Sequence, residues 1–404
     1  MKMLITPFVS LLLLLNNISI AQIQKNPGVY VEEVSSKPLS VAQVETAIPA
    51  FIGYTEIASR DLLFVPVKVS SFLEYERTFG VGATTEKFVL YPSLKLYFVN
   101  GGSPCYIVSV GPYKNLQKGN FINGLAAIGK VDEVTLLVFP DAVNLPGNDL
   151  YEVQKEALLQ AASLKDRFCI LDLKAATTNA EHSASVNEFR NNIGNNNLKY
   201  GAAYSPFLKI SNSASIPPSA IVAGQYCAVD KSKGVWKAPA NVTMKGVNDI
   251  AYAISESEQA GLSVDAVAGK SINAIRRFTG KGILIWGSRT LAGNDNEWRY
   301  VPVRRFFIMV EESIKKSLQP FVFEPNDANT WVKVKTMIQN YLTTKWRDGA
   351  LSGSKPEHAY FVKVGLGETM TQQDMLNKKM IIEIGMAPVR PAEFIITRIV
   401  MNVK

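Results

Sequence analysis

The sequence predicts two folded regions of different class, an α/β domain followed by an α+β domain, with a lone strand near each end of the chain. Three observations indicate this. Short apolar runs alternate with helical patterns up to about residue 205, long amphipathic helices follow residue 290, and an isolated β pattern lies near each terminus. With 404 residues, 47% of them apolar and 19% charged, the chain can bury cores for two or three domains.

The predicted α/β domain spans residues 47–205. Its strand candidates are apolar runs at 50–54, 105–110, 134–139, 168–173 and 199–204, and helical patterns at 151–165 and 184–192 lie between them. Short apolar strands that alternate with helices are typical of a largely parallel sheet covered by helices.

The predicted α+β domain spans residues 206–387. A strand at 283–286 precedes an amphipathic helix over 298–318, whose apolar residues recur at spacings of three and four. Asn326 or Asp327 can cap a second helix that reaches Trp346, and 380–384 is a further strand.

The strand patterns near the two ends have no obvious hairpin partner. The residues that we expect to form them are Val29, Tyr30, Val31 and Val34 at one end and Phe394, Ile396, Arg398 and Val400 at the other. A lone strand must pair with a distant part of its own chain or with another chain. Residues 22–46 and 388–404 are therefore candidate arms for one pairing or the other, and Pro38 and Pro388 lie beside their strands.

Residues 1–21 resemble a secretory signal, with one early lysine, five consecutive leucines from Leu11 to Leu15, and a Ser-x-Ala ending at Ala21. A wrongly assigned start codon and an uncleaved extension are the two alternatives. The apolar stretch is too short and too interrupted for a spanning helix, so we expect no direct insertion into a membrane.

No catalytic, cofactor or metal site is expected. The chain has three widely separated cysteines, Cys105, Cys169 and Cys227, and two histidines, His182 and His358, which disfavours disulfide scaffolds, zinc sites and most histidine-based triads. Gly269-Lys270-Ser271 resembles the end of a phosphate-binding loop, but Val264 stands where that loop needs glycine, so a turn is favoured. Asp166 and Asp172 flank a strand, where aspartates usually cap turns.

The net charge of +8 is concentrated in the last third of the chain. From residue 270 onward 21 Lys and Arg face 12 Asp and Glu, a net +9, whereas the preceding residues carry 22 against 23, a net −1. A basic surface of this kind suits an acidic protein, nucleic acid or anionic lipid. Two alternative functions therefore stay open beside assembly: a hydrolase that uses the α/β domain, and a nucleic-acid binder that uses the basic third.

Several segments closely resemble tail sheath proteins, the contractile sheath subunits of phages, pyocins and extracellular contractile injection systems. They occur in the family's order from Pro27 onward, and residues 1–21 lie outside the resemblance. The segments are 27–34, 41–55, 72–80, 97–108, 282–291 (ending WGSRTL), 297–305, 323–327, 342–351 (with WRDGAL) and 383–394.

The resemblance implies a non-enzymatic structural subunit that forms stacked hexameric rings around an inner tube and contracts to drive the tube through a target envelope. It implies an outer α/β domain inserted into an inner α+β domain, and arms that add strands to neighbouring subunits. Implied partners are further copies of the chain, the inner tube protein, baseplate proteins and a tail terminator, with no nucleic acid. Assembly is expected in the cytoplasm of the producing cell. The signal-like residues 1–21 would instead direct the chain to secretion, so the two expectations conflict.

A basic inner surface would suit an acidic tube because the charges are opposite. The contacts could also be released during contraction, because exposed ion pairs are individually weak, about 0–1 kcal/mol. The candidate tube-facing residues are Lys333, Lys335, Lys345 and Arg347. The alternative is that these residues form only the solvated face of their helix.

Overall fold

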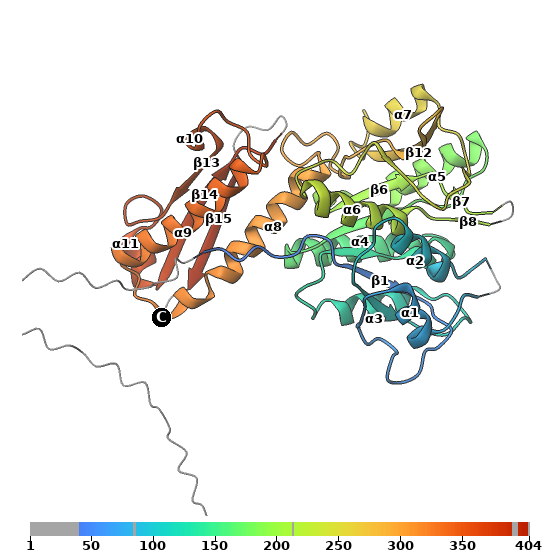
Figure 1. Ribbon diagram of the computed structural model, residues 1–404, viewed down its shortest axis with the longest axis horizontal. Coiled ribbons are helices and arrows are strands. Elements are labelled where there is room, and N and C mark those ends of the chain that lie inside the picture. Colours follow the sequence, from blue (N-terminus) through green and yellow to red (C-terminus); the bar gives the residue numbers. More distant parts are fainter. Residues whose placement is uncertain (1–39, 84–85, 212–213, 390–394, 403–404) are drawn as a thin grey trace, which may run out of the picture. The chain divides into compact units, whose positions relative to one another are not determined.

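The computed structural model describes residues 40–83, 86–211, 214–389 and 395–402 (Figure 1). The predictions for Val29, Tyr30, Val31, Val34 and Phe394 therefore lie outside the described residues. The fold is a mixed α/β fold, as the alternation of apolar runs and helical patterns predicts.

A nine-stranded sheet forms the first part of the fold. We call this sheet and the helices that cover it the α/β layer. Its strand order is β2-β3-β1-β4-β5-β6-β11-β12-β9. The six strands from β3 to β11 are parallel, and β2, β12 and β9 pair antiparallel at the two sides. The strands are β1 (Pro49–Gly53), β2 (Val67–Val69), β3 (Cys105–Ser109), β4 (Leu136–Val138), β5 (Phe168–Asp172), β6 (Gly201–Ser205), β9 (Val242–Thr243), β11 (Ile272–Phe278) and β12 (Gly282–Ile285).

Helices cover both faces of this sheet, with α3 and α4 on one face and α2 and α6 packed together on the other (Figure 1). The contact between α2 and α6 is close enough to require glycine, because a Cβ at Gly224 would lie 2.5 Å from the Tyr97 carbonyl oxygen. The helices are α1 (Phe72–Phe79), α2 (Leu90–Val99), α3 (Lys118–Ile128), η1 (Pro140–Asn144), α4 (Asp149–Leu164), α5 (Asn179–Asn192), η2 (Leu198–Tyr200), α6 (Ser219–Lys233) and α7 (Glu256–Ser263).

The α/β layer extends beyond residue 205, where the sequence analysis ends the α/β domain. Strand β11 pairs in parallel with β6 through Ile272 and Ala203, and β12 and β9 continue the sheet from β11. The reason is topological: residues 206–271 form α6, α7, a small three-stranded sheet and the short edge strand β9 before the chain returns to the main sheet at β11. That small sheet has the order β10-β7-β8, from β10 (Asp249–Ile250), β7 (Leu208–Lys209) and β8 (Ser215–Ile216).

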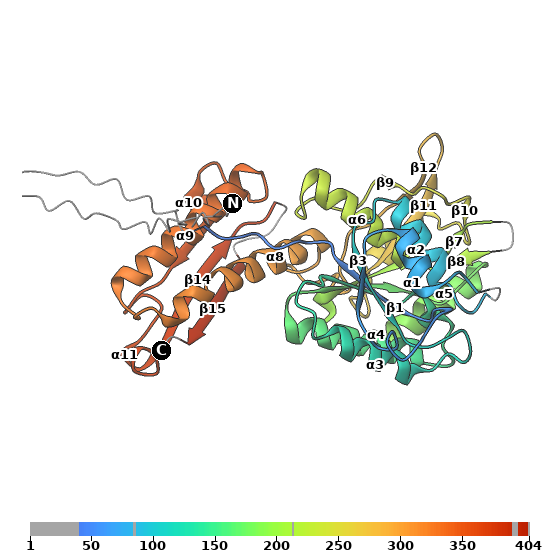
Figure 2. The ribbon, with the colours of Figure 1, turned by 60° about the horizontal axis from the view of Figure 1, so that its bottom comes forward.

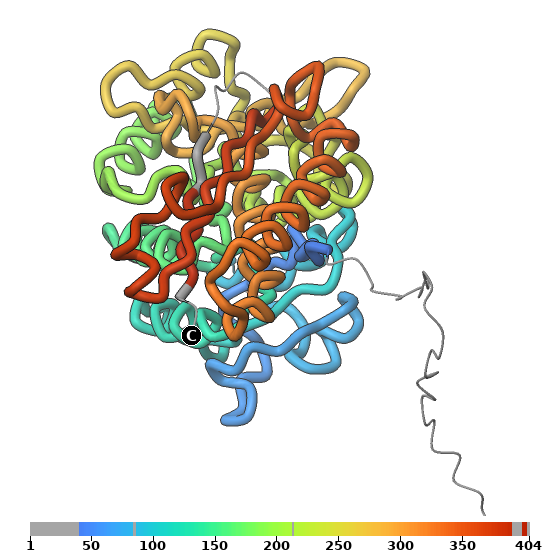
Figure 3. Tube along the Cα trace, turned by 90° about the vertical axis from the view of Figure 1, so that its left-hand side faces the viewer, coloured from blue at the N-terminus to red at the C-terminus, as the bar shows by residue number. Residues whose placement is uncertain are grey.

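The last part of the chain forms a second, three-stranded antiparallel sheet, which we call the terminal sheet. Its order is β13-β14-β15, and α9 packs along it (Figure 3). The elements are α8 (Val301–Ser317), η3 (Gln319–Phe323), α9 (Ala328–Arg347), α10 (Pro356–Ala359), β13 (Tyr360–Lys363), α11 (Gln372–Leu376), β14 (Lys379–Met386) and β15 (Ile395–Asn402). Asp327 caps α9, as the sequence predicts, by accepting a hydrogen bond from the Thr330 amide at 2.9 Å.

Two hydrophobic cores result, one in the α/β layer and one beneath the terminal sheet. Helix α8 contributes to both, because Val301 and Ile308 belong to the first core whereas Phe306, Phe307 and Ile314 belong to the second. Figure 2 shows α8 running from the α/β layer to the terminal sheet. The helix is therefore the structural connection between the two cores.

Candidate inter-subunit surface

The candidate inter-subunit side chains Arg398 and Val400 lie on the face of the terminal sheet that is turned away from its core. Met380, Ile382 and Ile384 alternate along β14 and are buried against α9, so the intervening residues of β14 point to the other face. On that outer face Arg398 donates to Glu383 at 3.0 Å, with side-chain exposures of 65% and 18%, and Val400 is 53% exposed.

The sheet also has two open edges. Within the described residues β13 and β15 each pair only with β14, so the far side of each strand has no strand partner. An unpaired strand edge is a template for adding a strand from another chain. Native proteins usually blunt such edges with charge, and Arg398 on β15 is one such charge.

The prediction that the C-terminal strand has no partner in its own chain is wrong. Residues 395–402 pair antiparallel with β14 over eight registered positions, from Ile395 opposite Met386 to Asn402 opposite Lys379. Pro388, which the sequence analysis places beside the C-terminal strand, follows the end of β14, so it removes no donor from the ladder between β14 and β15.

The chain enters its described part through residues 40–46, which we call the root segment. The Ala42 amide donates to Ser317 Oγ at 3.1 Å and the Val44 amide donates to Ser313 Oγ at 3.0 Å, and Val41 and Val44 pack against the second core. The last residues of the predicted N-terminal arm, 40–46, are thus bound to α8.

A buried ion pair holds the end of the root segment. Arg305 of α8 donates to Asp230 of α6 at 3.0 and 2.6 Å and to the Thr46 carbonyl oxygen at 2.9 Å. Thr46 Oγ1 in turn donates to Asp230 Oδ2 at 2.6 Å. Burial alone would lower the pKa of Arg305, but the Asp230 carboxylate raises it, so the guanidinium stays charged.

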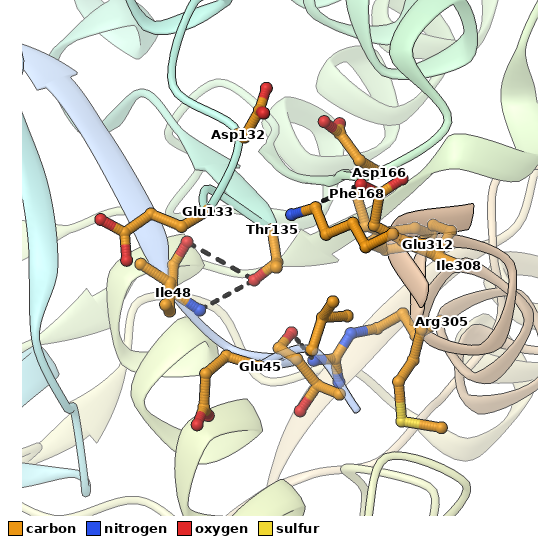
Figure 4. Close-up of a pocket in the computed structure, with 14 residues that line it drawn as sticks. Glu45, Ile48, Asp132, Glu133, Thr135, Asp166, Phe168, Arg305, Ile308 and Glu312 are labelled. Carbon is orange, nitrogen blue, oxygen red and sulfur yellow. Dashed lines mark hydrogen bonds and ion pairs between the residues drawn. The ribbon is translucent and has the colours of Figure 1, made fainter. Parts of the chain in front are cut away.

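Beside this ion pair lies a cavity of about 210 Å³ between the root segment, the loop before β4 and α8 (Figure 4). Its lining includes Glu45, Asp132, Glu133, Asp166 and Glu312, so it is acidic. Glu312 is paired with Lys315 and Lys316, and the Lys68 ammonium and the Tyr106 hydroxyl hold the pKa of Glu133 below its usual value.

The structure separates the four candidate tube-facing residues of α9. Lys333 and Arg347 are exposed, and Lys335 is half-buried. Lys345 is 8% exposed, pairs with Asp348 at 2.8 Å and lies over the rings of Trp236 and Tyr341. Lys345 therefore does not belong to the solvated face of the helix in this chain, because its position follows the apolar stripe of Val334, Ile338 and Tyr341.

The polar residues considered for chemistry have structural partners. The Asp172 carboxylate accepts from the amide and the hydroxyl of Ser219 at 2.9 and 2.5 Å and so caps α6, and burial raises the pKa of Asp172 to about 7. Asp166 binds Arg167. In the turn at 265–271, which resembles the end of a phosphate-binding loop, the Asp265 carboxylate accepts hydrogen bonds from the amides of Val267, Ala268 and Lys270 at 3.1–3.3 Å.

The histidines and cysteines have similar roles. His182 Nε2 lies 3.0 Å from Ser205 Oγ, and both residues are 4% exposed, so this Ser–His contact is enclosed by protein. His358 is exposed in α10, and the three cysteines are buried as free thiols. No group of three or more metal-binding side chains occurs in the described ranges. Among the same residues, no helix is both long and apolar enough to cross a bilayer.

Three groups of residues escaped the sequence analysis. They are the Arg305–Asp230 pair, the Ser313–Ser317 pair, and Asp141, which accepts backbone hydrogen bonds from Tyr54, Val89 and Leu90 at 2.5–2.9 Å. The i,i+4 spacing of the two serines on a long apolar helix was a visible signal. Nothing local marks Asp141 or Asp230, because their partners lie 51 to 87 and 75 to 184 positions away.

Comparisons with known proteins agree with this architecture. The sequence matches the phage tail sheath protein central domain over residues 119–291 and the phage tail sheath C-terminal domain over residues 293–402, together well over half of the chain. It is 28% identical over 131 residues to the tail sheath protein of Vibrio phage KVP40 and 27% identical over 143 residues to that of Salmonella phage ViI. These alignments cover 32% and 35% of this chain, and the chain spans only about a fifth of the length of those two relatives (19% and 22%).

Solved structures match over nearly the whole chain. A chain of the anti-feeding prophage baseplate is 40% identical with a TM-score of 0.72, and the match covers 93% of this chain and 99% of that one. A chain of the PVC sheath complex of an extracellular contractile injection system, in its contracted state, is 35% identical with a TM-score of 0.72 over 93% and 98% of the two chains.

The fold is shared more widely. A sheath tail protein from Desulfitobacterium hafniense has the same fold, with a TM-score of 0.65 over 93% of this chain and 100% of that one, at 11% identity. Family matches on both halves of the sequence and near-complete structural matches at 35–40% identity lead to one conclusion. The chain belongs to the contractile tail sheath family.

Proposed function

We propose that this chain is a structural, non-enzymatic subunit of a contractile sheath that polymerises as stacked hexameric rings around an inner tube and drives that tube through a target envelope. The observation that carries the proposal is the near-complete match to sheath chains of two contractile systems, both in the contracted state. No specific observation in the described residues supports either alternative, the hydrolase or the nucleic-acid binder.

Neighbouring subunits are joined by strand addition at the terminal sheet. Residues 29–34 of one copy, the predicted N-terminal strand, add to the open edge of β15 on the next copy. The C-terminal residues Ile396, Arg398 and Val400 then serve as part of the receiving strand, since β15 is already paired with β14 in its own chain. Backbone hydrogen bonds of this kind join subunits without depending on particular side chains.

The exposed cations of α9, Lys333 and Arg347, face the inner tube, and Lys335 lies at the margin of the same surface. Contacts between exposed charges are individually weak, about 0–1 kcal/mol each, so many of them hold a tube in register while remaining breakable. The further partners are the baseplate and a tail terminator. The subunit assembles in the cytoplasm of the producing cell and becomes part of a phage-tail-like particle.

Contraction needs no bound cofactor in this mechanism. The extended sheath is a metastable polymer, and subunits gain contacts as they rearrange, so a few kcal/mol per subunit adds up over many rings. The strands shared between copies make neighbouring subunits rearrange together.

The test is assembly with the inner tube protein, followed by electron microscopy. Deleting residues 22–34 should leave a folded subunit that forms no sheath. Val31→Pro should have the same effect because proline cannot donate to a strand ladder, and Val31→Thr, which keeps the amide and the β-branched shape, serves as the matched control. Normal sheaths from the deleted chain would overturn strand addition as the link between subunits.

A further inference from the structure

The root segment follows α8 in a regular way. Going forward along the chain, Ala42, Val44 and Thr46 contact Ser317, Ser313 and Arg305, so the extended segment runs antiparallel to the helix. Two residues of extended chain advance about 6.6 Å and four residues of helix about 6 Å. The two repeats nearly match from the Ala42–Ser317 contact to the Val44–Ser313 contact, whereas Thr46 contacts Arg305, eight residues before Ser313, through the long Arg305 side chain.

The contacts are stronger toward the end of the root segment. Ser317 is half-buried, Ser313 is fully buried and also donates to the Met309 carbonyl oxygen at 2.6 Å, and Arg305 is 3% exposed. Thr46 is held from two sides, by the Arg305 guanidinium on its carbonyl oxygen and by the Asp230 carboxylate on its hydroxyl. Hydrogen bonds to charged groups contribute more to stability than neutral ones.

Removing the root segment from α8 would take hydrogen bonds away from buried groups. Arg305 and Asp230 would each lose a hydrogen bond, although they would still pair with each other, and the apolar side chains of Val41 and Val44 would leave the second core. Hydrogen bonds of buried charged groups are costly to lose, so these losses oppose detachment together.

We infer that residues 40–46 stay docked on α8 in both the extended and the contracted sheath, and that Ser313, Ser317, Arg305 and Asp230 are positioning residues that fix where the N-terminal arm leaves the subunit. The inference rests on the proposed function of that arm. The connection between the arm strand and the docked segment is then limited to five residues, 35–39, and five residues span at most about 18 Å. A root segment that peeled off would instead give twelve residues of tether, 35–46, with a reach of about 40 Å.

Hydrogen exchange on wild-type particles decides between these two states of the segment. The Ala42 and Val44 amides should exchange on the order of tenfold or more slowly than the neighbouring Gln43 and Glu45 amides, in extended and in contracted sheaths alike. Loss of that protection in either state would overturn the inference. This measurement does not depend on any variant folding.

A reversible disulfide provides a second test. In the double variant Ala42→Cys/Ser317→Cys the two positions are already joined by a 3.1 Å contact, and the three native cysteines are buried. The oxidised protein should assemble and contract to the same extent as the same protein after reduction. A sheath that fails to assemble or contract only when oxidised would show that the segment must detach, and would overturn the inference.

The double variant Ser313→Ala/Ser317→Ala tests the positioning role. It should raise the exchange rates of the Ala42 and Val44 amides on the order of tenfold. Unchanged exchange in the double variant would mean that the serines do not hold the segment. These outcomes differ from failure of the proposed function, which is read from normal assembly after deletion of residues 22–34.

Discussion

Arg305 of α8 and Asp230 of α6 form a two-pronged buried ion pair, with nitrogen–oxygen distances of 3.0 and 2.6 Å. The Arg305 guanidinium also lies 4.5 Å from the centre of the Tyr226 ring. The pair joins the helix shared by both cores to the helix that covers the α/β layer, and it holds the root segment between them.

Removing one partner of this pair should destabilise the subunit strongly. Asp230→Ala leaves a buried guanidinium without its counter-charge, and we expect the free energy of unfolding to fall by about 3–5 kcal/mol. The double variant Arg305→Met/Asp230→Leu removes both charges and should recover at least half of that loss. Urea unfolding of the unassembled subunit measures both values, and equal losses for single and double variants would contradict the prediction.

Asp141 should be equally sensitive, for a different reason. Its carboxylate satisfies the amides of Val89 and Leu90 at the start of α2 and the amide of Tyr54 after β1. Asp141→Ala leaves these donors buried and unpaired, so we expect a loss of about 3 kcal/mol or more in the free energy of unfolding. Asp141→Asn keeps one oxygen for two of the amides and should lose less.

Gly53 provides an independent check on this site. A Cβ at position 53 would lie 2.7 Å from Asp141 Oδ2, so Gly53→Ala should also destabilise the subunit. Gly119→Ala is the matched control, because a Cβ at Gly119 meets nothing within 4 Å. Equal stability of the two glycine variants would contradict the close approach.

Stability should increase on mild acidification because of Asp172. Burial raises the pKa of Asp172 to about 7, above the ordinary value of about 3.9 for an unfolded chain. Between these two values the folded state holds the extra proton. The free energy of unfolding therefore falls as pH rises through this window, by up to about 1.4 kcal/mol per pH unit.

Asp172→Asn should flatten this pH dependence between pH 5 and 7, since the amide can still accept from the Ser219 amide. The same substitution at Asp132, an exposed carboxylate, should leave the dependence as it is in the wild type. Thermal or urea unfolding at several pH values measures both. An unchanged slope in Asp172→Asn would contradict the assignment.

Attachment to the inner tube should depend on the exposed cations of α9. Lys333→Glu/Arg347→Glu should weaken co-assembly with an acidic tube, and high salt should weaken the wild type in the same direction. Lys87→Glu/Lys130→Glu, which changes the charge equally on exposed residues of the α/β layer, is the control. Co-sedimentation of sheath with tube measures the effect, and equal behaviour of the two double variants would remove α9 from the tube-facing surface.

Much of the fold could be predicted from the sequence, because its signals are local. The apolar runs that become β1, β3 and β5 are bounded by turns, and the capping residue Asp327 marks the start of α9. Strand β11 was missed because Arg276 and Arg277 interrupt its apolar run, although Ile272 and Ile275 are buried. Pairing over a long sequence distance then placed it in the α/β layer.

The inter-subunit surface was predicted less completely. The edge position and exposed face of Arg398 and Val400 follow from a strand near the terminus, but the partner β14 was not recognised across the intervening prolines. Lys345 was proposed to face the tube, or else solvent, although its place on the helix is that of Val334 and Ile338. The ion pair of Arg305 depends on two helices meeting in space, for which the sequence has no local pattern.

Helix α8 belongs to two hydrophobic cores at once, with Ile308 packed in one and Phe306 and Phe307 in the other. Because α8 is a continuous helix of 17 residues, the two layers cannot rotate about it independently. Rotating one end of the helix would displace packed side chains at the other end. If the proposed strand addition joins the copies, a change of ring diameter is taken up by the connections between subunits, while each subunit moves as one rigid body.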